Sequence, residues 1–164
     1  MKKWILILIS LLLLMLDNSL MPFFSIKGAY PTLIFTFAIA YSIIYGRKEA
    51  VIIGVISGLL QDIFFYNGFG VNSLINMLLC LLAAIIGENI YREKKLIPIV
   101  STVFLSLLKV FAIALILKLS NKTVNGTIGI YSSIYNAVVM FLGYNFVLRL
   151  YDNNYKKKSW RFKW

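Results

Sequence analysis

Long hydrophobic runs separated by short polar breaks fill the chain up to about residue 150. Six of these runs have the length of about 17–25 mostly apolar residues that a transmembrane helix needs. They cover residues 4–24, 29–45, 50–66, 71–90, 96–119 and 128–150. The breaks, such as residues 46–49 (GRKE) and 92–95 (REKK), contain the glycine and charged residues typical of turns. The pattern predicts an all-α integral membrane protein with six transmembrane helices.

The first hydrophobic run is interrupted in its second half by Asp17 and Pro22. A proline inside a helix removes a hydrogen bond and breaks or kinks it. The sequence therefore leaves open whether one helix continues through Pro22 or ends near Leu16 and is followed by an interfacial segment. Lys2 and Lys3 before an apolar run are also typical of a secretory signal peptide, but no small-x-small cleavage site follows. We expect a retained signal anchor.

Composition excludes a soluble domain. Of the 164 residues, 60% are hydrophobic and 14% are charged, against about 45–50% and about 25% in ordinary soluble domains. A chain this small cannot bury so much apolar surface in water. We expect a single polytopic membrane domain over residues 1–150 and a basic, aromatic cytoplasmic tail over residues 151–164.

The charged residues predict the orientation of the helices. The net charge is +11, with 17 lysines and arginines against 6 acidic residues. In a six-helix topology most of these bases fall on the side of both termini, and only Lys27, Lys118 and Lys122 fall on the other. Cytoplasmic loops carry the excess of lysine and arginine, so both termini are expected in the cytoplasm.

The end of the chain combines bases with aromatic residues: Lys156, Lys157, Lys158, Trp160, Arg161 and Lys163. In a membrane protein such a segment favours an anionic bilayer surface over nucleic acid as its partner. Alternatively, these residues serve only to keep the C-terminal end of the chain on the cytoplasmic side of the membrane.

Residue types exclude most catalytic chemistry. The chain has no histidine and one cysteine, Cys80, inside an apolar run. A Ser–His or Cys–His catalytic pair is therefore impossible, and a zinc, haem or iron–sulfur site is not expected. We also find no pair of carboxylates for a membrane hydrolase. We expect no catalytic residue, no cofactor and no metal ion.

Four polar residues inside the expected helices form a candidate cluster: Gln61, Asp62, Lys109 and Asn136. Such residues are costly in hydrocarbon and mark protein-facing positions. At about 1.5 Å per residue, Asp62 lies roughly 18 Å and Lys109 roughly 20 Å above the inner ends of their helices. One hypothesis is an intramembrane ion pair between them, bridged by Asn136. In the alternative, Lys109 extends along its stem to the membrane surface and Asp62 caps the outer end of its helix.

A row of small residues lies on the face of the third helix that contains Asp62. Gly54, Gly58 and Asp62 are four residues apart and share one face. The spacing of Gly54 and Gly58 lets another helix approach closely, either from the same chain or from a partner. Gly70 belongs to the following turn, where glycine permits a positive φ.

Residues 54–65 (GVISGLLQDIFF) and 68–74 (GFGVNSL) resemble the rod shape-determining protein MreD family. That family shows a G-x-x-x-G-L-x-x-D pattern, a short glycine-containing turn and a small-residue helix start. The positions that match are Gly54, Gly58, Asp62 and Gly70. The chain is also similar in length, in its proline-containing second helix and in its basic tail.

The resemblance implies a non-enzymatic membrane scaffold of the bacterial cell-elongation complex, located in the cell membrane and contributing to cell shape and peptidoglycan synthesis. It implies binding to a bitopic MreC-type protein, together with MreB, a RodA-type polymerase and a class B penicillin-binding protein. A function of another class stays open. The six-helix arrangement also resembles the substrate-binding S component of energy-coupling-factor vitamin transporters, an architecture that MreD-like proteins share.

Overall fold

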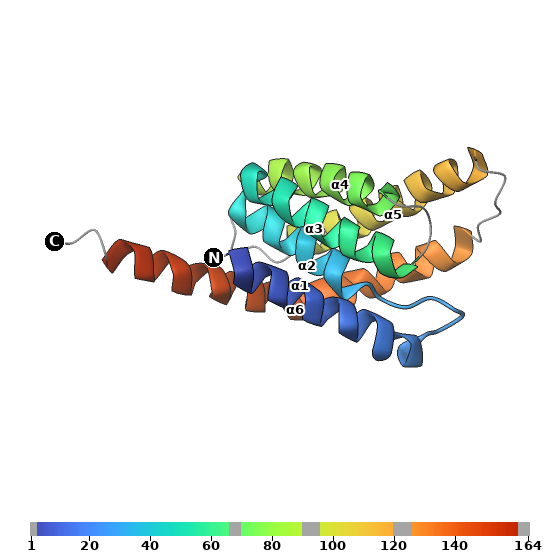
Figure 1. Cartoon of the computed structure of the whole chain (residues 1–164), viewed down its shortest axis with the longest axis horizontal. Helices are drawn as coiled ribbons and strands as arrows, with labels where there is room; N and C mark the ends of the chain where they lie inside the picture. Colours follow the sequence, from blue (N-terminus) through green and yellow to red (C-terminus); the bar gives the residue numbers. More distant parts are fainter. Residues whose placement is uncertain (1–2, 66–69, 90–95, 120–125, 161–164) are drawn as a thin grey trace.

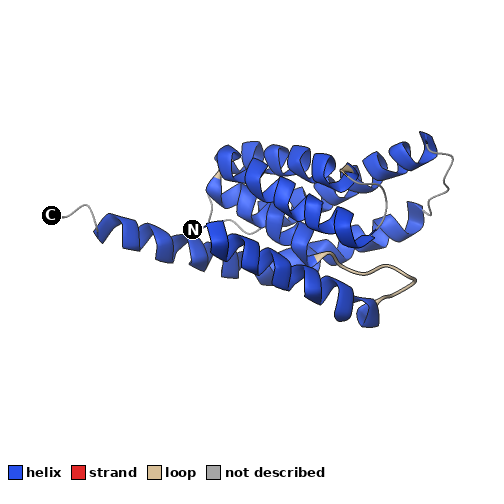
Figure 2. Cartoon of the chain, viewed as in Figure 1, coloured by secondary structure: helices blue, strands red, loops and turns tan. Residues whose placement is uncertain are grey.

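This computed structural model describes residues 3–65, 70–89, 96–119 and 126–160. It contains six α-helices: α1 (Lys3–Ser19), α2 (Leu33–Tyr45), α3 (Arg47–Phe65), α4 (Val71–Glu88), α5 (Leu96–Leu119) and α6 (Gly126–Trp160). A short 3₁₀ helix, η1 (Met21–Phe24), follows α1. The described residues form helices joined by loops (Figure 2), which confirms the prediction of an all-helical protein with six helices.

Helix α2 lies at the centre of the bundle (Figure 1). All of its residues from Ile34 to Ile44 are buried, as expected of a helix that is apolar on every side. The other five helices all pack on α2, and they contact one another in the order α1, α3, α4, α5, α6. The backbones of α6 and α1 do not meet. Five helices therefore surround α2, with one gap between α6 and α1.

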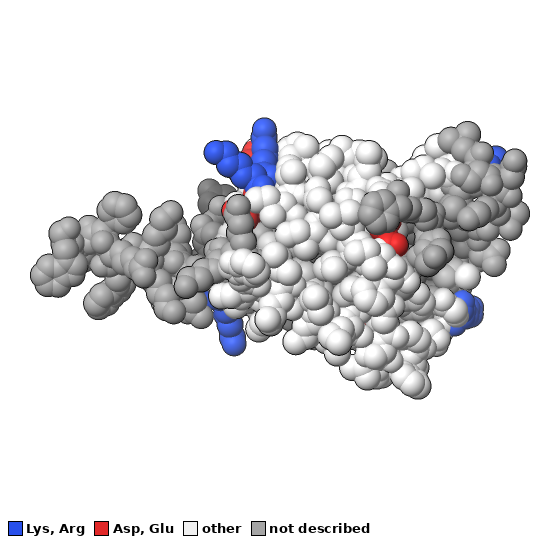
Figure 3. Space-filling view, viewed as in Figure 1, with Lys and Arg blue, Asp and Glu red and all other residues white. Residues whose placement is uncertain are grey.

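The outer surface of the bundle is apolar. Large hydrophobic side chains such as Leu8 on α1, Phe104 on α5 and Phe141 on α6 are exposed. Figure 3 shows lysine and arginine atoms towards the two ends of the bundle, a small group of acidic atoms right of the middle, and an otherwise uncharged face. So many exposed large hydrophobic side chains would be unusual in a soluble monomer and are expected where lipid surrounds the protein.

Three helices contain segments long and apolar enough to cross a membrane: Val71–Glu88, Leu96–Ile116 and Ile128–Leu150. Trp4–Ser19 and Leu33–Tyr45 are shorter apolar helices. Helix α3 begins with Arg47, Lys48 and Glu49, so its apolar part is shorter than the helix itself.

The two ends of the chain differ from the expected boundaries. Helix α1 ends at Ser19, and Pro22 lies in η1, so the first hydrophobic run forms two elements. Helix α6 continues to Trp160, beyond residue 150, and extends past the rest of the bundle (Figure 1). For Lys156, Lys157, Lys158 and Trp160 only the helical backbone is described, and Arg161 and Lys163 lie outside the described residues.

Candidate functional site

Asp62, near the end of α3, caps the beginning of α4. Its side chain is buried, and its carboxylate accepts three backbone hydrogen bonds: from the N–H groups of Gly70 (3.0 Å), Asn72 (2.9 Å) and Ser73 (3.0 Å). The first N–H groups of a helix have no partner within the helix, and its N-terminus favours negative charge. Gly70 has a φ of 93°, in the left-handed region that favours glycine. Asp62 and Gly70 together therefore fix the turn between α3 and α4.

The glycine face of α3 packs directly against α4. A Cβ atom placed on Gly54 would lie 2.6 Å from the Cα of Met77, and one on Gly58 would overlap the Cα of Ser73. Real Cβ atoms do not approach other carbons so closely, so both positions require glycine. The sequence left open whether a helix of the same chain or of a partner approaches this face. In the structure it is α4 of the same chain. Gly54, Gly58, Asp62 and Gly70 thus lie in one α3–α4 contact.

Lys109 of α5 lies inside the bundle and contacts α3 through Gln61. Its Nζ donates a hydrogen bond of 2.7 Å to the side-chain oxygen of Gln61. The same oxygen accepts a bond of 2.9 Å from the amide of Asn76 on α4. The Nζ also lies 4.3 Å from the centre of the Phe35 ring on α2, in a cation–π contact. This cluster connects four helices.

Asp62 and Lys109 form no ion pair. Within the described part of the chain, the one ion pair joins Arg47 and Glu88, at 2.6 Å. The oxygens of Asp62 point to the start of α4, while the neighbouring Gln61 points to Lys109. Lys109 is 9% exposed, so it stays in the bundle and does not extend to its surface. The structure therefore differs from the hypothesis of an Asp62–Lys109 ion pair and from that of a lysine extending to the membrane surface. Asp62 caps the start of α4, and the uncharged amide of Gln61 faces the lysine.

Asn136 of α6 bonds to α2 and α5, away from Asp62. Its Oδ1 accepts a hydrogen bond of 2.8 Å from the backbone N–H of Thr32, and its Nδ2 donates one of 3.1 Å to the hydroxyl of Ser106. The structure therefore brings together Gln61 and Lys109 of the expected cluster. Asp62 accepts hydrogen bonds from backbone N–H groups at the start of α4, and Asn136 accepts one from the residue just before α2.

Asp17 is a second buried carboxylate, which the sequence analysis treated only as an interruption of the first helix. It is 1% exposed and accepts hydrogen bonds from the backbone N–H groups of Leu33 (2.7 Å) and Ile34 (3.0 Å). Asp17 therefore caps α2 as Asp62 caps α4. The signal that was available is common to both residues: each is an aspartate near the end of one apolar helix, shortly before the next helix begins.

The polar side chains described above hold helices together. The described residues contain no group of three or more histidine, cysteine, aspartate or glutamate residues placed to hold a metal ion. The carboxylates bind backbone N–H groups, and the lysine binds an amide. This chemistry fixes the rotation and height of each helix relative to its neighbours.

Comparison with protein families gives one match, to the rod shape-determining protein MreD, over residues 1–153. The chain belongs to the MreD family. The matched range contains the glycine face, both capping aspartates and the Lys109 cluster. Comparison with curated proteins and with solved structures gave no match. The resemblance based on Gly54, Gly58, Asp62 and Gly70 is thus confirmed at the level of the family, which is one of structural membrane proteins that act in rod-shape determination.

Proposed function

We propose that this MreD-family chain is a non-enzymatic scaffold in the bacterial cell membrane that binds an MreC-type bitopic protein and thereby supports peptidoglycan synthesis during cell elongation. The family match over residues 1–153 carries the proposal. The described polar groups add support, because they serve contacts between helices of this chain. In the wider complex the partners are MreB, a RodA-type polymerase and a class B penicillin-binding protein.

The proposed topology has six membrane spans in one domain over residues 1–150, with both termini in the cytoplasm. Helix α1 begins and α6 ends at the same end of the bundle (Figure 1), as an even number of spans requires. Arg47, Lys48 and Arg149 are exposed near that end. Near the opposite end, Lys27 lies 5.1 Å from the ring centre of Tyr131. This distribution agrees with the positive-inside rule and with aromatic residues at the membrane surface.

Single cysteines test this topology. In a Cys80→Ser background, Lys48→Cys is expected to react with a membrane-impermeant maleimide only after the cells are opened. Lys27→Cys is expected to react in intact cells. The reverse pattern, or equal labelling of both, would contradict the topology.

The proposed binding surface for the partner is the lipid-facing side of the bundle. Because α4 occupies the glycine face of α3, a partner helix contacts the lipid-facing side chains of the bundle. Exposed residues such as Phe104, Val138 and Phe141 belong to this surface.

Affinity purification tests the scaffold function. The tagged chain is extracted from its native membrane in mild detergent, and bound proteins and small molecules are identified by mass spectrometry. An MreC-type protein with wall-synthesis enzymes is the expected result. A pair of ATPase subunits with a bound vitamin in their place would contradict the proposal.

A further inference from the structure

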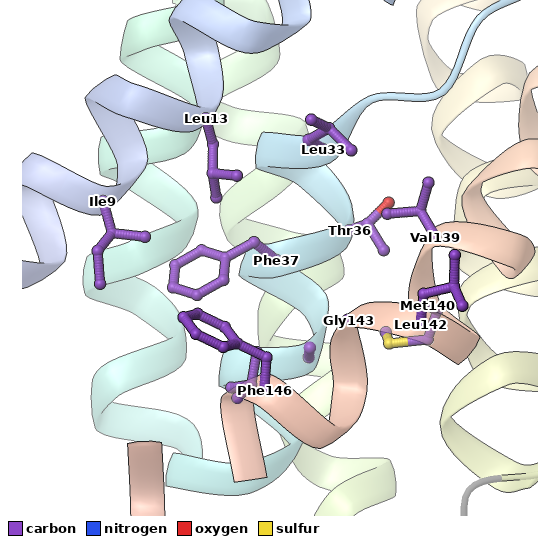
Figure 4. A pocket seen from close by; sticks show the side chains of 12 residues that line it. Ile9, Leu13, Leu33, Thr36, Phe37, Val139, Met140, Leu142, Gly143 and Phe146 are labelled. Carbon is purple, nitrogen blue, oxygen red and sulfur yellow. The ribbon is translucent and has the colours of Figure 1, made fainter. Parts of the chain in front are cut away.

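The gap between α6 and α1 contains an apolar groove of about 370 Å³. Its walls include Leu13 of α1 and Val139, Gly143 and Phe146 of α6, and its floor is α2 (Figure 4). None of the lining residues is charged. The polar side chain among them, Thr36, donates its hydroxyl hydrogen to the carbonyl oxygen of Thr32 at 2.9 Å. The groove therefore offers carbon surface to an occupant.

Gly143 keeps this groove open. A Cβ atom placed there would meet no heavy atom within 4 Å, unlike the Cβ atoms placed on Gly54 and Gly58. Gly143 is not among the residues with positive φ, so neither close backbone contact nor backbone geometry requires glycine at this position. Glycine is less favourable than alanine inside a helix. The position therefore adds open space to the groove.

The groove is narrower than a helix. Its floor residues Thr36, Phe37 and Ala40 are 3%, 7% and 2% exposed. A gap that admitted a helix of about 10–12 Å diameter would leave these side chains far more exposed. A hydrocarbon chain is much thinner, so the geometry favours a lipid acyl chain over a transmembrane helix.

Arg149 is a cation that follows the groove residues along α6. Arg149 is exposed and follows Leu142 by seven residues and Phe146 by three, so it lies on the same edge of α6 as these two groove residues. Along a helix the distance from Phe146 to Arg149 is about 4.5 Å, which brings the guanidinium within reach of the end of the groove. Arginine binds phosphate oxygens well, because its planar fork presents paired N–H donors.

We propose that this groove binds one anionic phospholipid from the leaflet on the side of Arg149, with an acyl chain along Gly143 and Phe146 of the groove wall and the phosphate at Arg149. The lipid fills the gap in the ring of helices around α2 and joins α1 to α6.

Native mass spectrometry of the full chain, released from nanodiscs of phosphatidylglycerol and phosphatidylcholine, tests this site. The wild-type protein is expected to retain one phosphatidylglycerol. Arg149→Gln is expected to lower its retention about fivefold, the effect of one cation at a membrane surface. Lys48→Gln removes an exposed cation at the same end of the bundle but away from the groove, and is expected to behave as wild type. Equal retention by Arg149→Gln and Lys48→Gln would overturn the proposal.

Two further variants test the groove itself. Gly143→Leu fills the open space and is expected to abolish retention of the phosphatidylglycerol molecule. Val100→Leu enlarges an exposed side chain of α5, away from the groove, and is expected to leave lipid retention unchanged. A photo-crosslinking residue in place of Phe146 is expected to give lipid adducts in native membranes. Adducts with another protein in place of lipid, or full lipid retention by Gly143→Leu, would overturn the proposal.

Discussion

Replacing Asp62 is expected to loosen the start of α4 and destabilise the fold. The carboxylate accepts three backbone hydrogen bonds, of which the one from Asn72 is buried and those from Gly70 and Ser73 are partly buried. A buried N–H group left without an acceptor costs about 1–3 kcal/mol, while partly buried groups regain hydrogen bonds to water or headgroups. Asp62→Ala is therefore expected to lower the free energy of unfolding by about 3 kcal/mol. Asp62→Asn keeps one acceptor oxygen but loses the charge, and is expected to lower it by about 1–2 kcal/mol.

Unfolding of the purified protein in mixed micelles, followed by circular dichroism, measures these changes. Asp17→Ala is a matched variant, because Asp17 caps α2 with one buried and one partly buried hydrogen bond. It is expected to lower the free energy of unfolding by a similar amount. Glu88→Gln removes an exposed carboxylate from the ion pair with Arg47 and is expected to cost less than about 1 kcal/mol. A cost for Asp62→Ala as small as that of Glu88→Gln would refute the capping role.

A double-mutant cycle separates capping from an ion pair with Lys109. If Asp62 acts on α4 alone, the effects of Asp62→Asn and Lys109→Met are expected to add within about 0.5 kcal/mol. A larger coupling between the two substitutions would show that the carboxylate and the lysine stabilise each other directly.

The other predictions concern the glycine face and the lysine cluster. Gly58→Ala is expected to destabilise the protein by about 2 kcal/mol, because the added methyl group meets the α4 backbone; Gly143→Ala, where space is open, is expected to stabilise it by up to about 1 kcal/mol. Equal thermal shifts for the two variants would contradict the close α3–α4 contact. Gln61→Leu leaves the buried Lys109 without its oxygen partner and is expected to cost about 3 kcal/mol. The double variant Gln61→Leu/Lys109→Met is expected to recover most of this loss, and a double variant less stable than Gln61→Leu alone would exclude the cluster as the cause.

The helices could be predicted from the sequence because the bilayer demands long apolar segments. Their polar partners could not, and Asp62 shows why. Counting residues along two helices gives the height of each side chain, and Asp62 and Lys109 do occur at similar predicted heights. Height says nothing about rotation, and neighbouring residues on a helix point about 100° apart. In the structure Gln61 faces Lys109 and Asp62 faces the start of α4.

The pattern of small residues on α3 also predicted part of the structure and left part open. The spacing of Gly54 and Gly58 predicts a close approach of two helices, but it does not identify the second helix. The structure places α4, the next helix along the chain, on this face. The position of Asp17 between two apolar helices is a signal for capping, but the role also requires α1 and α2 to lie side by side, which no local pattern encodes.

The polar interior holds the helices together, and we propose that the scaffold acts through its lipid-facing surface. The most direct test substitutes exposed apolar residues of α5 and α6, such as Phe104 and Phe141, and measures recovery of an MreC-type partner together with the thermal stability of each variant. Surface variants are expected to lose the partner at unchanged stability, and interior variants such as Asp62→Ala are expected to lose partner binding and stability together. Retention of the partner by every surface variant, with loss only in stable interior variants, would contradict the proposal.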